Sequence, residues 1–129
     1  MEILLLIGRV LFGGFFLMMG MMHFKNLKNM TGYAASKGVP SPALAVAGSG
    51  LLILLGGLGV ILGIFVKISL LFIAIFLFLI TPKMHQFWKE TDPNKKMAEM
   101  QHFLKNMALF GATLALLALS SGWAFSIYF

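Results

Sequence analysis

Long runs of apolar residues, separated by short polar segments, dominate the pattern of this chain. The runs cover residues 3–22, 43–64 and 68–80. At about 1.5 Å of rise per residue, some twenty residues of helix cross the roughly 30 Å hydrocarbon core of a bilayer. The third run is short for a span unless it continues past Pro82 toward Trp88, and we expect a kink or a stop at Pro82. The pattern predicts membrane-spanning helices.

A fourth helix is predicted from its start signal and its periodicity. Asp92 can cap free amide groups, and Pro93 suits the first turn of a helix. Apolar residues then recur at helical spacing from Met97 onward. We therefore expect an amphipathic segment outside the membrane that runs directly into a fourth span, which ends near Leu119.

The segment 23–42, between the first two runs, is polar with apolar residues at helical spacing. Leu27, Met30 and Ala34 fall on one side of a helix. This spacing predicts a short interfacial helix that lies on the bilayer surface. Pro42 suits the first position of the following span.

Composition agrees with lipid as the solvent for one domain, residues 1–129. Hydrophobic residues make up 60% of the chain and charged residues 11%, with a mean hydropathy of +0.94, whereas soluble domains average about 25% charged residues. The chain has no cysteine, which excludes disulfides and thiolate metal sites. We predict an all-α membrane protein: a bundle of four transmembrane helices with the interfacial helix in its first loop. Trp123, Tyr128 and Phe129 suit an aromatic belt.

The net charge of +6 comes from lysines in short loops and not from one exposed stripe, so we predict lipid headgroups and no nucleic acid as partners. Four spans place loops 23–42 and 81–102 on the same side. These loops contain Lys25, Lys28, Lys37, Lys83, Lys89, Lys95 and Lys96. The positive-inside rule therefore predicts cytoplasmic loops and two outside termini in a multi-pass protein of the cell membrane.

Arg9 is a charge placed within the first span. An arginine at a helix centre costs about 2.5–3.5 kcal/mol on insertion, so it should face the bundle and have a partner. One alternative makes Arg9 a donor to a substrate carbonyl or anion. In the other, it snorkels outward toward Glu2.

Other polar residues lie near the predicted cytoplasmic boundary. His23, His85 and His102 share this depth and can in principle bind a transition metal or an iron-porphyrin, but their spacings match no local metal motif, and we predict no metal site. Asn106 places an amide in the first turns of the fourth span, where it is expected to hydrogen-bond to a neighbouring helix or to a ligand. The apolar segments of the four predicted spans contain no Asp or Glu, which argues against a proton-coupled antiporter.

Several different short motifs follow one another along nearly the whole chain. They are Gly8-Arg9, Phe12-Gly13-Gly14, Gly20, the segment 33–40, Leu55-Gly56-Gly57, the segment 85–88 and the segment 102–106. In this combination the sequence resembles the DoxX family of small bacterial membrane proteins. The resemblance implies a four-helix membrane bundle, which in some members is linked to quinones or to oxidative-stress complexes.

Carried over residue by residue, the resemblance points to five candidate ligand-binding positions: Arg9, Trp88, His102, Lys105 and Asn106. The chain departs from many relatives at Ile53, where they have a glutamate.

Three functions are compatible with these features. The first is a quinone-binding or quinone-linked component of a membrane oxidoreductase or oxidative-stress system, with a quinone as the non-covalent cofactor. The second is a non-catalytic scaffold that recruits a soluble redox enzyme to the cytoplasmic face. The third is a carrier for a small amphipathic solute. The small-residue helix faces are also compatible with a homo-oligomer.

Overall fold

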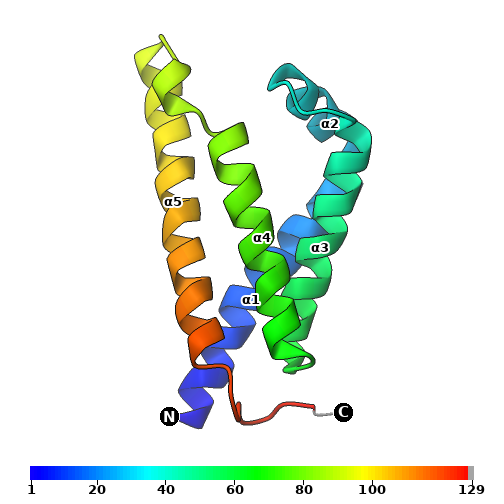
Figure 1. Cartoon of the computed structure of the whole chain (residues 1–129), viewed down its shortest axis with the longest axis vertical. Coiled ribbons are helices and arrows are strands. Elements are labelled where there is room, and N and C mark those ends of the chain that lie inside the picture. Colours follow the sequence, from blue (N-terminus) through cyan, green and yellow to red (C-terminus); the bar gives the residue numbers. More distant parts are fainter. Residues whose placement is uncertain (128–129) are drawn as a thin grey trace.

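The computed structural model is built from helices and describes residues 1–127. Its elements are α1 (Glu2–Lys25), α2 (Leu27–Ser36), α3 (Pro42–Leu62), α4 (Val66–Met84), the 3-10 helix η1 (Phe87–Lys89) and α5 (Pro93–Ala118). The long helices run along one axis as a bundle, with α2 and η1 at one end and the N-terminus and the segment after α5 at the other (Figure 1). The helix predicted within the first loop is confirmed as α2.

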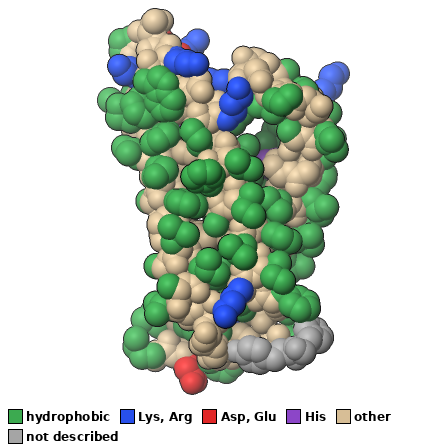
Figure 2. All heavy atoms as spheres, in the orientation of Figure 1, with side chains coloured by type: hydrophobic (Ala, Val, Ile, Leu, Met, Phe, Trp, Pro, Cys, Tyr) green, Lys and Arg blue, Asp and Glu red, His purple; other side chains and the backbone are tan. Residues whose placement is uncertain are grey.

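Within residues 1–127, three segments are long and apolar enough to cross a membrane: α1, α3 and residues Val66–Lys89, which contain α4. The protein is therefore a membrane protein with several apolar helices. Lysine and arginine side chains gather at the α2 end of the face shown in Figure 2, while the middle of this face is largely hydrophobic. The crossing of α5, the predicted fourth span, stays a prediction.

Glycines bring α1 and α3 into backbone contact. A Cβ atom on Gly13 would lie 2.6 Å from the carbonyl oxygen of Gly57, and one on Gly20 would lie 2.8 Å from the backbone nitrogen of Leu54. In lipid, such close approach of backbones supplies packing energy that the hydrophobic effect does not. The helix α3 also packs on α4, and α4 packs on α5, so α3 has a central position in the bundle.

The predicted helix starts are confirmed, and one predicted stop is displaced. The Asp92 carboxylate accepts a hydrogen bond from the backbone amide of Asn94 at 3.2 Å, directly before Pro93. The helix α4 continues through Pro82 and ends at Met84. Pro82 has no N–H to donate to the carbonyl oxygen four residues earlier, and α4 ends two residues after it, at Met84.

Trp123 is not a lipid-facing belt residue, so this prediction is wrong. Its side chain is buried, its indole N–H donates to the carbonyl oxygen of Leu119 at 2.9 Å, and the Arg9 guanidinium lies 5.4 Å from its ring centre. Trp123 packs in the hydrophobic core because the chain turns back under the bundle after α5 (Figure 1). Tyr128 and Phe129 lie outside the described residues.

Candidate functional site

Arg9 lies near the end of the bundle that carries the N-terminus and the segment after α5, and it joins three parts of the chain. Its side chain is 1% exposed, and its guanidinium donates to the carbonyl oxygens of Val60 and Ile61 at 3.0 Å each, and to those of Ala124 and Phe125. The last carbonyls of a helix have no partner within the helix, and a cation is favourable there. Arg9 therefore caps the C-terminal end of α3 and does not snorkel to the surface.

A cavity of about 250 Å³ lies at the other end of the bundle, beside α2. Its walls are mainly aromatic, aliphatic and methionine side chains. The polar and charged side chains that line it are His23, Tyr33, Ser49, His85, His102, Lys105 and Asn106. Figure 2 shows a hollow near the α2 end with histidine atoms inside it. An apolar cavity with a few polar groups is the usual form of a small-molecule site.

Asn106 and Lys105 place polar groups at the α5 wall of this cavity. Asn106 is 7% exposed and lines the void, and no other residue in 1–127 forms a hydrogen bond with its side-chain amide. The Lys105 ammonium lies 5.5 Å from the ring centre of Phe15, across the cavity on α1. A buried amide without a protein partner is costly unless a ligand or water completes its hydrogen bonds.

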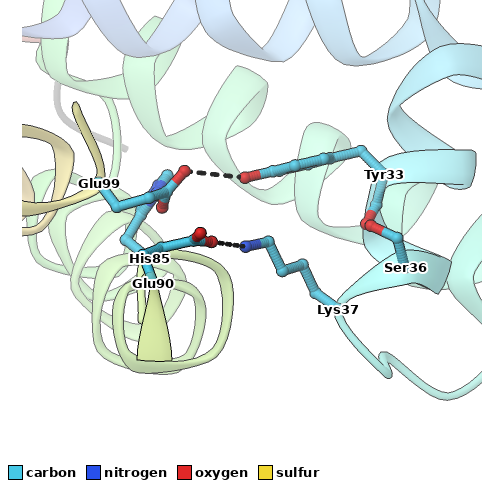
Figure 3. Close-up of polar contacts among 6 residues, drawn as sticks. All are labelled: Tyr33, Ser36, Lys37, His85, Glu90 and Glu99. Atoms are coloured by element: carbon cyan, nitrogen blue, oxygen red, sulfur yellow. Dashed lines mark hydrogen bonds and ion pairs between the residues drawn. The ribbon is translucent and has the colours of Figure 1, made fainter. Parts of the chain in front are cut away.

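Glu99 connects α2 with the segment that follows α4. One oxygen of its carboxylate lies 2.9 Å from Nδ1 of His85, and the other accepts a hydrogen bond from the Tyr33 hydroxyl at 3.1 Å. Figure 3 shows Tyr33 pointing from α2 toward Glu99. The ring of His85 stacks on that of His102 at 5.1 Å, so both histidines are fixed beside the cavity.

A second contact runs parallel to the first. The Lys37 ammonium, at the end of α2, lies 3.7 Å from the Glu90 carboxylate (Figure 3).

Burial, with the charge of Glu99 next to it, raises the pKa of Tyr33 to about 12. Burial alone would raise the pKa of Glu99, but hydrogen bonds from His85 and Tyr33 outweigh it and lower that pKa. At neutral pH, the hydrogen bond between α2 and α5 therefore joins the neutral hydroxyl of Tyr33 to the ionised carboxylate of Glu99.

The model of the DoxX family matches residues 4–86, which contain α1 to α4 except for the first two residues of α1. The chain belongs to the DoxX family. Neither the curated proteins nor the solved structures contain a significant match. In this DoxX protein the cavity is bounded by the matched helices on one side and by α5, which lies beyond the matched residues, on the other.

The structure separates the five positions that the sequence singled out. His102, Lys105 and Asn106 line the cavity together. Trp88 lies in η1, half exposed, with its ring edge-on to the ring of Phe103 at 5.8 Å. Arg9 is bound to backbone carbonyls at the opposite end.

Sequence reasoning did not select Tyr33, His85 and Glu99 for the site. These three side chains come from α2, from the segment after α4 and from α5, so no local spacing connects them. The available signal was that the histidines and the tyrosine lie at one predicted depth.

Proposed function

We propose that this DoxX protein binds a quinone in the cavity beside α2, as a component of a membrane oxidoreductase or oxidative-stress system. The observation that carries the proposal is the buried amide of Asn106, which faces an apolar void and has no hydrogen-bond partner among residues 1–127. A cavity of about 250 Å³ has the scale of one substituted ring, because pockets for larger drug-sized ligands begin at about 300 Å³.

The side chains present fit the chemistry of a quinone ring. Its faces are apolar, and Phe15, Phe76 and Met19 line the void. Its two carbonyl oxygens only accept hydrogen bonds, and Asn106 and Lys105 can donate. When bound, the quinone supplies the redox chemistry, while these residues bind the ring, orient it and keep water away.

Arg9 has a structural role in this proposal. Its guanidinium is engaged by carbonyls of α3 and of the segment after α5, at the end of the bundle away from the cavity. The donors for the ligand are then His102, Lys105 and Asn106, which were selected together with Arg9 from the sequence.

The membrane arrangement that accompanies this function has four spans. α5 lies alongside most of α4 (Figure 1). The apolar part of α5 therefore reaches the same depth as the apolar part of α4. We place loops 23–42 and 81–102 on the cytoplasmic side of the cell membrane and both termini outside, because the lysines gather in these loops. The cavity then lies near the cytoplasmic face, where a soluble redox partner can approach it.

The test is extraction of bound small molecules from protein purified in mild detergent, with quinones quantified by mass spectrometry. We expect near-stoichiometric quinone in the wild type and in the control Met107→Leu, whose side chain is exposed on the same helix. In Asn106→Leu the affinity should fall about tenfold, since one buried hydrogen bond of about 1.4 kcal/mol is lost, so the quinone content should fall from near-stoichiometric to about half. Folded Arg9→Leu should retain its quinone.

An absence of enrichment over bulk lipid in the wild type would refute the proposal. In that case the membrane scaffold is the better function. A half-exposed Trp88 next to Lys89 would then be the surface to test for a soluble partner.

A further inference from the structure

His23 is a buried histidine that the proposed function does not yet use. It lies in the last turn of α1, is 5% exposed and lines the cavity. Its Nδ1 atom lies 2.7 Å from the carbonyl oxygen of Met19, one turn earlier. Because a carbonyl oxygen can only accept, Nδ1 must carry the hydrogen. In the neutral imidazole, Nε2 is then an acceptor with a lone pair.

The surroundings hold this ring in place. A Cβ atom on Gly50 would lie 2.6 Å from Cβ of His23, so a glycine is needed there for α1 to carry the histidine at this depth. The ring of Phe76 packs edge-on to the imidazole, with 6.0 Å between ring centres. Across residues 1–127, the hydrogen bonds of His23 reach Met19 and leave Nε2 available.

We infer that the cavity selects a ligand that carries a hydroxyl group, the quinol form or a related phenol, and that Nε2 of His23 accepts its hydrogen bond. This inference rests on the proposed function and specifies the ligand. The site then presents an acceptor on α1 and an amide, which can donate or accept, on α5 at Asn106. A quinol matches both groups. An oxidised quinone has only acceptors, and one of its carbonyl oxygens would face the lone pair of Nε2.

The experiment is an equilibrium titration of purified protein in mild detergent. The probes are duroquinone, a fully methylated benzoquinone, durohydroquinone kept reduced with dithionite, and the dimethyl ether of durohydroquinone. We expect durohydroquinone to bind the wild type about tenfold more tightly than either of the others, the usual effect of one buried hydrogen bond. In His23→Phe this preference should disappear, and in His23→Gln, which restores an acceptor oxygen, part of it should return. Met22→Leu, an exposed neighbour on α1, is the matched control.

The outcomes separate the inference from the proposed function. If duroquinone binds as tightly as durohydroquinone, or if the preference persists in folded His23→Phe, the inference is wrong while the quinone site stands. If His23→Phe does not fold, the dimethyl ether decides the question. If the wild type binds the dimethyl ether as tightly as durohydroquinone, the hydroxyl has no role and the inference is wrong. If none of the three probes binds the wild type, the proposed function fails as well.

Discussion

Replacing Arg9 with leucine should destabilise the protein by about 3 kcal/mol. The substitution leaves the carbonyl oxygens of Val60 and Ile61, at the end of α3, without their donor. Each buried group left unsatisfied costs about 1–3 kcal/mol, so the loss is about 2–6 kcal/mol. Removal of the guanidinium also removes the free-energy penalty of its burial, which brings the expected net loss toward the lower part of that range.

The measurement is thermal unfolding in mild detergent, followed by tryptophan emission. In a Trp88→Phe background, Trp123 is the one remaining tryptophan, and it lies directly beside Arg9. A loss of about 3 kcal/mol should lower Tm by about 10 °C, and the emission of Trp123 should shift to the red because the segment that follows it loses its anchor. Arg9→Lys, which keeps the charge but not the planar fork of donors, should give an intermediate Tm.

The control is Leu11→Ile on the same helix. Leu11 is 71% exposed, so this substitution should leave Tm unchanged. The argument for a structural Arg9 would be refuted if Arg9→Leu melted within about 2 °C of the wild type with unshifted Trp123 emission.

Three further predictions follow from the structure. Gly13→Ala should lower the free energy of unfolding by about 1–3 kcal/mol by forcing α1 away from α3, while Gly14→Ala, which meets no atom within 4 Å, should be neutral, as compared by thermal unfolding. In a Tyr128→Phe background, the tyrosinate absorbance should give Tyr33 a pKa of about 12. When Glu99→Gln is added, the pKa of Tyr33 should fall but stay above 10, because Tyr33 is still partly buried. Because burial and the charge of Glu99 together raise this pKa, the neutral Tyr33 hydroxyl contributes stability below about pH 10 that is lost as the pH rises through 12. A C-terminal reporter enzyme active only outside the cytoplasm should be active, and a silent reporter on well-expressed protein would contradict the proposed orientation.

Much of the fold was accessible from the sequence because lipid imposes simple rules. The length of an apolar run fixes a helix, and local signals such as Asp92 before Pro93 fix where a helix starts. The exception was Pro82. Pro82 removes one backbone donor, but α4 continues for Lys83 and Met84 before it ends, so the stop lies two residues after the proline.

The site was less accessible, since its partners are distant in sequence. Within residues 1–127, the acceptors of Arg9 include backbone carbonyls at sequence separations of 51 to 116 residues, and a carbonyl has no signature in a sequence. For the same reason, the isolated charge of Arg9 suggested a ligand or the membrane surface. His102, Lys105 and Asn106 were selected from the family resemblance, and they line the cavity together because they lie within two turns of α5.

The anchoring of Arg9 has a consequence for the order in which the protein is made. Arg9 lies in α1, and its acceptor at Ala124 is synthesised 115 residues later. At the usual rate of about 5–20 residues per second, several seconds separate the two. During this interval the buried guanidinium of Arg9 lacks part of its final hydrogen-bonding shell, so this end of the bundle can close only after Ala124 has been synthesised.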